Sequence, residues 1–217
     1  MNFEQARFNM VEQQIRPWQV LDKDVLHVLS NVRRELFVPA AYQALAYTDI
    51  EIPLSHGQLM VPPRVDARLM HDLQLKGCEK VLEIGTGQGY LTALLAGRAQ
   101  RVISLEQHAD IATQARENLQ RAGVTNADVR VADGSHGLAA EGPFDAIVLG
   151  GSVAEVPQSL LNQLAVGGRL LAIVGTDLTM SATRFSRTSQ TDWESHKLWD
   201  CQTAALDGFP VPSRFHF

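Results

Sequence analysis

The part of this sequence best suited to chemistry is an apolar strand that ends in a run of glycines, within residues 81–90. An acidic residue, Glu83, precedes Gly85, Gly87 and Gly89, which are spaced two apart. Glycine lets the backbone approach a ligand closely, and the start of a helix presents free N–H groups. Because an apolar, helix-like run follows the glycines, the pattern predicts a strand-to-helix turn that holds a nucleotide-like ligand.

The spacing of the glycines indicates which class of ligand this turn would hold. A dinucleotide site has the pattern G-x-G-x-x-G/A, with a small residue where the helix packs against the strand. Here Tyr90 occupies that position, and Gly89 comes one residue early. The resulting E-x-G-x-G-x-G form, from Glu83 onward, resembles the signature of S-adenosylmethionine (AdoMet) methyltransferases. That resemblance implies AdoMet as the cofactor, with Thr86 beside it; the alternative is a glycine turn without this ligand in any doubly wound sheet.

Two further acidic residues follow the next two predicted strands. Strand 101–106 ends in Glu106, whose carboxylate can accept hydrogen bonds from both hydroxyls of a ribose. Strand 128–132 is followed by Asp133 and Gly134, where Asp133 can accept from an adenine amino group and Gly134 leaves space for the ring. Ligands of open parallel sheets bind at the carboxyl ends of the strands, so these residues are predicted to share one cofactor site with the glycine turn.

The composition favours a soluble enzyme and argues against other classes of protein. The chain has 217 residues, of which 45% are hydrophobic and 20% charged, and its formal net charge of -5 gives no basic surface for nucleic acid. No segment approaches the roughly 18 apolar residues of a membrane span, and the first residues lack the layout of a secretion signal. Cys78 and Cys201 have no metal-like spacing, and the histidines lack helical i, i+4 pairing. We therefore expect a cytoplasmic protein with reduced thiols and without a metal.

The first part of the chain reads as a helical extension followed by a loop. Apolar residues from Phe3 to Ile15 fall on one helical face, and Arg16-Pro17 is expected to stop that helix. Asp22 can cap a second helix, with an apolar face from Val25 to Val32. Residues 47–63 lack helical periodicity and contain several prolines, which is typical of a substrate loop over a ligand site.

From about residue 64 the pattern alternates between helices and strands. We expect helices over 64–75, 91–96, 108–122 and 158–164 and strands over 80–84, 101–106, 128–132, 144–149 and 169–174. Alternating segments at 180–187 and 193–199 predict an antiparallel hairpin at the sheet edge. The predicted fold is a doubly wound, Rossmann-like α/β methyltransferase sheet with an N-terminal helical extension and C-terminal antiparallel edge strands. One domain, residues 1–217, would comprise the extension and substrate loop (1–63) and the AdoMet-binding core (64–217).

A series of motifs from about residue 9 to about residue 175 is similar to the bacterial protein-L-isoaspartate O-methyltransferase family. The helical N-terminus followed by a His-Gly-Gln loop is more specific to this family than the glycine turn. The motifs are Met10-Val11-Glu12-Gln13-Gln14-Ile15, Phe37-Val38-Pro39, Tyr47-Thr48-Asp49, Pro53-Leu54-Ser55-His56-Gly57-Gln58, residues 81–90, Asp133-Gly134 and Phe144-Asp145-Ala146-Ile147.

The resemblance implies a protein-repair enzyme that acts on isoaspartyl residues in damaged peptides and proteins. Such an enzyme esterifies the free α-carboxyl of the isoaspartyl residue. The ester then cyclises to a succinimide, which reopens in part to normal aspartate.

The sequence departs from the family on the acceptor side of the site. The family's loop continues from Gly-Gln through Thr-Ile-Ser, and its serine is the residue usually assigned as catalytic, but Val61 occupies the serine position here. Ser55 or Ser152 could replace the missing hydroxyl, while His56 and Gln58 are candidate substrate-loop residues. After the fourth strand the family tends to read Thr-Ala-Ala-Ala-Pro, whereas this chain has Gly150-Gly151-Ser152-Val153-Ala154.

Three functions remain open on the sequence alone. The first is an AdoMet-dependent carboxyl O-methyltransferase of the isoaspartate-repair type. The second keeps AdoMet but transfers the methyl group to another carboxylate or to a small molecule, because Val61 reshapes the acceptor pocket. The third is a non-catalytic protein that binds AdoMet.

Overall fold

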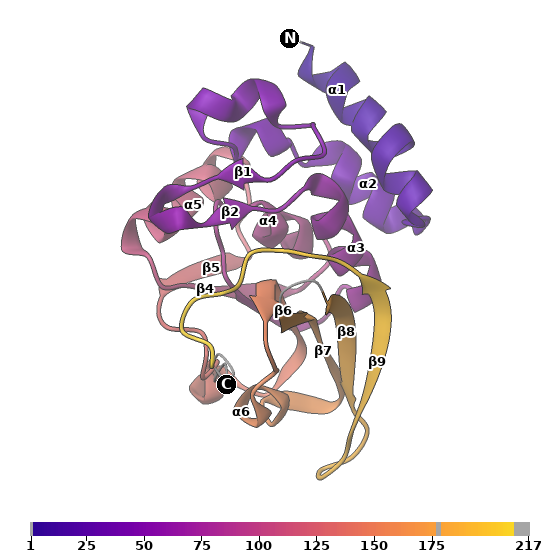
Figure 1. The fold of residues 1–217 in the computed structure, drawn as a ribbon, viewed down its shortest axis with the longest axis vertical. Coiled ribbons are helices and arrows are strands. Elements are labelled where there is room, and N and C mark those ends of the chain that lie inside the picture. Colours follow the sequence, from indigo (N-terminus) through magenta and orange to yellow (C-terminus); the bar gives the residue numbers. More distant parts are fainter. Residues whose placement is uncertain (1, 177–178, 211–217) are drawn as a thin grey trace, which may run out of the picture.

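A seven-stranded sheet forms the centre of the molecule in the computed structural model, which describes residues 2–176 and 179–210 (Figure 1). The strand order is β5-β4-β3-β6-β7-β8-β9; the first five are parallel, and β8 and β9 are antiparallel to their neighbours. The strands are β3 (Lys80–Ile84), β4 (Arg101–Glu106), β5 (Ala127–Val131), β6 (Phe144–Val153), β7 (Leu164–Thr176), β8 (Thr179–Arg187) and β9 (Trp193–Asp200). The predicted parallel sheet with an antiparallel edge is confirmed.

Side chains on the central strands alternate between two buried layers. Val81 and Val102 pack with helices α3 and α4 on one face, while Leu82 and Ile103 pack with α6 on the other. Neighbouring residues of a strand point to opposite faces, so continuous apolar strands require cover on both sides. The helices are α3 (Pro63–Leu73), α4 (Tyr90–Ala96), α5 (Ala109–Arg121) and α6 (Gln158–Leu161).

Three boundaries around β6 and β7 differ from the prediction by three residues or more, and one of them is the end of β6, expected at 149 and found at Val153. The helix expected over 158–164 ends at Leu161, and β7 already begins at Leu164. Leu164 pairs with Phe144 at the start of β6, which draws this part of the chain into the sheet before the glycines at 167 and 168. Pairing with a neighbouring strand therefore overrides the local helical pattern.

The N-terminal extension consists of α1 (Phe3–Met10), a π-helical turn (Val11–Ile15), a 3-10 turn (Arg16–Trp18) and α2 (Lys23–Asn31). The helical run ends at Ile15, and a single 3-10 turn closes it at Trp18, so the stop predicted at Arg16-Pro17 is confirmed to within one residue. Proline is tolerated there, since the first turn of a helix leaves its backbone N–H groups without helical partners. The predicted cap is confirmed: Oδ1 of Asp22 accepts from the backbone N–H groups of Asp24 at 2.8 Å and Val25 at 3.1 Å.

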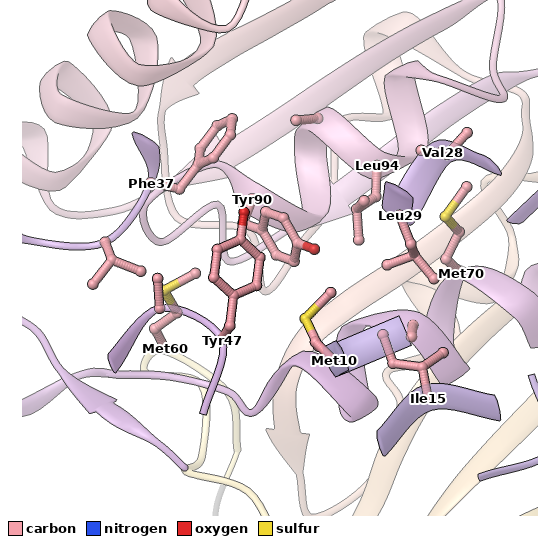
Figure 2. Close-up of a cluster of buried hydrophobic side chains, with 14 of the residues drawn as sticks. Met10, Ile15, Val28, Leu29, Phe37, Tyr47, Met60, Met70, Tyr90 and Leu94 are labelled. Atoms are coloured by element: carbon pink, nitrogen blue, oxygen red, sulfur yellow. The ribbon is translucent and has the colours of Figure 1, made fainter. Parts of the chain in front are cut away.

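The extension packs against the helix that follows the glycine turn. Figure 2 shows Met10 and Leu29 from the extension, with Phe37 and Tyr90 in the same buried cluster. The rings of Phe37 and Tyr90 meet edge to face, with 5.7 Å between their centroids. The extension is therefore part of the core that holds the start of α4.

The loop expected over 47–63 contains a short antiparallel pair, β1 (Ile52–Pro53) and β2 (Leu59–Met60), which the lack of periodicity did not predict. Between these strands a 3-10 turn (Ser55–Gly57) holds His56 at a positive φ of 58°. In Figure 1 this hairpin lies beyond the end of the sheet that carries the glycine turn. The substrate loop is thus folded back on itself.

After β9 the chain, yellow in Figure 1, returns across the molecule to the same end of the sheet. The N–H of Ser152 donates to Ala204 at 2.9 Å, and the N–H of Leu206 donates to Ser152 at 2.9 Å. We call residues 201–210 the C-terminal segment.

Within the described residues, no helix is both long and apolar enough to cross a membrane.

Candidate functional site

A cleft of about 660 Å³, open to solvent, lies at the carboxyl ends of β3, β4 and β5. The predicted residues that line it are Gln58, Val61, Gly85, Gly87, Glu106 and Gly134. Apolar walls come from Leu54, Ile84, Leu105, Ile111, Leu206 and Phe209. The strand ends predicted to share a site therefore do meet at one cleft.

The glycine turn brings the backbone against the C-terminal segment and against α5. Gly85 has a φ of 88°, and a Cβ there would lie 2.7 Å from a side-chain carbon of Leu206. Gly89, also at 88°, caps α4, and a Cβ there would lie 3.3 Å from Leu119. Both positions require glycine for their positive φ, and Gly85 also keeps the floor of the cleft free of a side chain.

Glu106 is the charged residue that best fits a ribose diol. It is buried at the cleft wall, where Oε2 accepts from the N–H of Gly87 at 3.0 Å and Oε1 accepts from the N–H of His108 at 3.1 Å. These bonds fix the carboxylate, while each oxygen keeps further acceptor capacity for a hydroxyl. The bare glycine floor, the fixed carboxylate and the apolar walls together fit the adenosyl and methionine parts of AdoMet.

Glu83 lies outside the residues that line the cleft. It is fully buried, and its Oε2 accepts from the hydroxyl of Thr92 on α4 at 2.5 Å. Burial raises the pKa of Glu83 to about 8, although the bond from Thr92 opposes the shift. The structure thus places Glu83 behind the glycine turn, where it ties β3 to α4; contact with a cofactor stays a prediction.

Asp133 and Gly134 differ in where their atoms lie. Gly134 lines the cleft, but a Cβ there would come within 2.3 Å of Ile84, so close packing on β3 is one reason for glycine. Asp133 is not among the lining residues; its Oδ1 accepts from the N–H of Ser135 at 2.9 Å, which lowers the pKa of Asp133. Its carboxylate faces Gly208 of the C-terminal segment. The predicted bond from Asp133 to adenine remains a prediction.

Polar contacts tie the substrate loop to the residues beside the cleft. The amide of Gln58 donates to Asp207 at 2.7 Å, and Nε2 of His108 lies 3.6 Å from the same carboxylate. The rings of His56 and His108 are stacked, with 4.1 Å between centroids, and Nε2 of His56 lies 2.9 Å from Asp110. His56 therefore supports the loop from outside the cleft, whereas Gln58 reaches its wall.

Sequence reasoning missed His108 and the C-terminal segment as parts of the site. Gly150 and Gly151, predicted on the acceptor side, also line the cleft, whereas the sequence did not identify Gln107, His108, Ile111 and 204–207 with Phe209. His108 lies two positions after Glu106, so its place just beyond a predicted strand end could have identified it as a residue of the site. The C-terminal segment has no periodicity and no motif, and only its long-range pairing with β6 places it.

A second cavity of about 370 Å³ adjoins the cleft. Leu59, Val61 and the three glycines 85, 87 and 150 line both spaces. The second cavity is further lined by Met60, Asp66, Thr86, Gln88, Tyr90 and Leu91. We call it the acceptor cavity, because Val61, the residue at the family's serine position, lines both this space and the cleft.

Neither serine considered as a replacement for the missing hydroxyl lines the acceptor cavity. The hydroxyl of Ser152 is buried and donates to the carbonyl of Thr203 at 3.0 Å. The hydroxyl of Ser55 donates to Asp110 at 3.0 Å on the outer side of the loop. The idea that one of them takes the serine's place is therefore wrong for this structure.

Among the described residues, no group of three or more His, Cys, Asp or Glu side chains is arranged to hold a metal ion.

Comparison with known proteins gives one family over nearly the whole chain. The family model of protein-L-isoaspartate(D-aspartate) O-methyltransferase matches residues 5–206. A protein-L-isoaspartate O-methyltransferase of Methanoculleus marisnigri is 46% identical over 169 residues, which cover 78% of this chain and 77% of that protein. A protein of the same name from Syntrophus aciditrophicus is 38% identical over 208 residues, which cover 95% of each chain.

Solved structures show the same fold at lower identity. A Plasmodium falciparum protein described under the same enzyme name, solved in complex with S-adenosyl-L-homocysteine, has a TM-score of 0.77 at 23% identity. The match covers 95% of this chain and 99% of that one. The Rossmann-like fold predicted from the sequence is thus confirmed, and the chain belongs to the protein-L-isoaspartate(D-aspartate) O-methyltransferase family.

Proposed function

We propose that this protein is an AdoMet-dependent O-methyltransferase that esterifies the free carboxylate of isoaspartyl residues in damaged proteins. The observation that carries the proposal is the continuity of the two spaces at Val61. The cleft, which fits an adenosyl group, and the acceptor cavity share lining residues around Val61, so a methyl donor and a carboxylate can meet there. Family membership supports both the cofactor and the acceptor.

The chain's own residues would hold the cofactor through backbone and one carboxylate. Glu106 would accept from the ribose hydroxyls, and the glycine turn from Gly85 would lie against the methionine part. When bound, AdoMet supplies a methyl group on a positively charged sulfur. The loop and the C-terminal segment, joined by Gln58 and Asp207, would exclude water from the place where it reacts.

The acceptor needs little from the protein besides its position. A peptide carboxylate has a reference pKa of about 3.3 to 3.9, so it is ionised at neutral pH and requires no general base. Orientation of the reacting atoms and exclusion of water would supply most of the rate. A missing hydroxyl at Val61 would remove a hydrogen bond of about 0.5–1.5 kcal/mol, or up to about 3 kcal/mol if its partner stays buried. Activity would then fall by about 2- to 13-fold, or by up to about 160-fold if the partner stays buried, and would not be abolished.

A different acceptor is not favoured over this assignment. The named relatives match the chain along most of their own length. With a net charge of -5, the chain also offers no general attraction to nucleic acid. We further propose a cytoplasmic location, in keeping with two free cysteines, Cys78 and Cys201.

Methyl transfer to two peptides of identical sequence tests the proposal. One peptide carries an isoaspartyl residue and the other a normal aspartyl residue at the same position. We expect a base-labile methyl ester on the isoaspartyl peptide alone, measured by mass spectrometry with AdoMet as donor. Equal labelling of both peptides, or none of either by protein that binds AdoMet, would overturn the assignment.

A further inference from the structure

A buried ion pair lies beside the acceptor cavity, and the proposed function does not yet use it. Arg34 is 0% exposed and Asp66 is 3% exposed, with Nη1 of Arg34 2.8 Å from Oδ2 of Asp66. The guanidinium also donates through Nη2 to the carbonyl of Val61 at 2.7 Å and lies 4.5 Å from the ring centroid of Tyr90. The pair therefore holds the loop, α3 and α4 together at the wall between the two spaces.

Asp66 supplies the carboxyl group on the wall of the acceptor cavity. Most of the other lining residues in the described part of the chain are apolar or glycine, and Val61 has no donor. Only Oδ2 of Asp66 has a hydrogen bond from a described residue, the one from Arg34. The second oxygen is therefore available to a ligand in the cavity.

Burial of Asp66 and the negative charge of a second carboxylate favour a proton on this carboxyl, whereas the charge of Arg34 opposes it. Arg34 faces it from the 3-10 turn Arg34–Leu36, Glu83 interacts with it from β3, and Tyr90 from α4. Burial raises the pKa of Asp66 to about 6, even though the guanidinium of Arg34 opposes the shift. A bound acceptor carboxylate adds negative charge at the same place, and like charges raise a carboxyl pKa further.

We propose that Asp66 binds the acceptor carboxylate in this chain, donating a hydrogen bond from its protonated carboxyl where the family has a serine hydroxyl. Arg34 stays charged, so the protonated pair carries one positive charge that matches the negative acceptor. The proton comes from solvent when the peptide binds and remains on Asp66 while the other acceptor oxygen takes the methyl group. It returns to solvent once the acceptor has become a neutral ester. This inference rests on the proposed function, because the ligand is its isoaspartyl carboxylate.

Proton uptake on peptide binding is the first test, and it uses the unmodified protein. The isoaspartyl peptide is titrated into protein saturated with S-adenosylhomocysteine at pH 7, in two buffers of different ionisation enthalpy. We expect uptake of about 0.5 to 1 proton per peptide, because Asp66 changes from mostly ionised to protonated. Asp66→Asn, whose amide donates without titrating, is the matched control and should bind the peptide with no proton uptake.

Kinetics of variants provide the second test. The KM for the isoaspartyl peptide should rise with pH above about 6 in the wild type, and Asp66→Asn should remove that dependence while staying within about threefold of wild type at pH 6. Asp66→Val should raise KM by about tenfold or more, and Val61→Ser added to it should restore most of the loss. Affinity for S-adenosylhomocysteine and the melting temperature report whether each variant is folded.

The results separate this inference from the proposed function. Methyl transfer to the isoaspartyl peptide with no proton uptake, or a wild-type KM in folded Asp66→Val, would overturn the role of Asp66 and leave the function standing. If Asp66→Val does not fold because Arg34 loses its partner, the proton count and Asp66→Asn still decide. A protein that neither binds nor methylates the peptide would overturn both.

Discussion

The cofactor cleft and the acceptor cavity are built by different means, although they share a wall. Strand ends, backbone and one fixed carboxylate, Glu106, form the floor of the cleft, and the substrate loop and the C-terminal segment complete its walls. The acceptor cavity depends on a buried pair, Arg34 and Asp66, that joins parts of the chain 32 residues apart. The first arrangement depends on the course of the backbone and on one carboxylate, whereas the second depends on a buried pair of side chains.

The largest effect on ligand affinity is expected from Glu106→Ala, which changes a residue of the cleft and none of the acceptor cavity. The variant removes the acceptor for the ribose and leaves the N–H groups of Gly87 and His108 without their partner. Hydrogen bonds to charged groups contribute about 1.5–3 kcal/mol, so affinity for S-adenosylhomocysteine should fall about 10- to 100-fold or more in calorimetry.

Glu117→Ala, on the exposed face of α5, is the control for this change and should bind as the wild type does. Wild-type affinity in Glu106→Ala would mean that the ligand does not use this strand end. The cleft could then no longer be described as a cofactor site built on strand ends, in contrast to the acceptor cavity.

Glu83→Gln tests how the fold supports the turn between the two spaces. The pKa of Glu83 in the folded protein, about 8, lies above its ordinary value of 4.5, so the folded state binds an extra proton between these values. Wild-type stability is therefore lost as pH rises through this window. Glutamine mimics the protonated form and should be more stable than the wild type at pH 8.5 by roughly 1–3 kcal/mol, with little difference near pH 5.

Urea denaturation at these two pH values measures the effect of Glu83→Gln. Glu155→Gln at an exposed position serves as the control and should follow the wild type at both. Asp66, whose pKa is also raised, should leave part of the pH dependence in place. A Glu83→Gln protein that is less stable than the wild type at pH 8.5 would show that the buried carboxylate is needed in its ionised form.

Val61→Ser tests the acceptor side by restoring the family's hydroxyl. The residue is 7% exposed and lines both spaces, so a hydroxyl there would face the acceptor. We expect a gain of about three- to tenfold in kcat/KM for the isoaspartyl peptide, which corresponds to one hydrogen bond. Val61→Thr, similar in volume and carrying a hydroxyl, should give part of the gain. No gain from either variant would indicate that Val61 does not face the acceptor carboxylate.

The smallest effect is expected from Asp207→Ala, which breaks the contact between Gln58 and the C-terminal segment. Asp207 is about half exposed, and exposed polar pairs contribute little. Affinity for S-adenosylhomocysteine should fall by only about two- to fivefold. A loss as large as that of Glu106→Ala would mean that closure of the loop, and not the strand ends, dominates cofactor binding.

The sequence predicted the cleft far better than the acceptor cavity. The glycine turn, Glu106 and the parallel strands follow local rules of spacing and periodicity, and the structure places them together. Asp66 falls in the first turn of α3, where an acidic residue is ordinary, and nothing local indicates that its carboxyl is buried against Arg34. Pairings between distant segments, such as Ser152 with the C-terminal segment, have no periodic signal either.

A crystal structure of the complex with S-adenosylhomocysteine tests the central claim most directly. The account predicts the adenosyl group in the cleft, with ribose hydroxyls within hydrogen-bond distance of Glu106 and the sulfur turned toward Val61 and the acceptor cavity. A ligand bound at another place, or one whose sulfur is separated from the acceptor cavity by the protein wall, would contradict it.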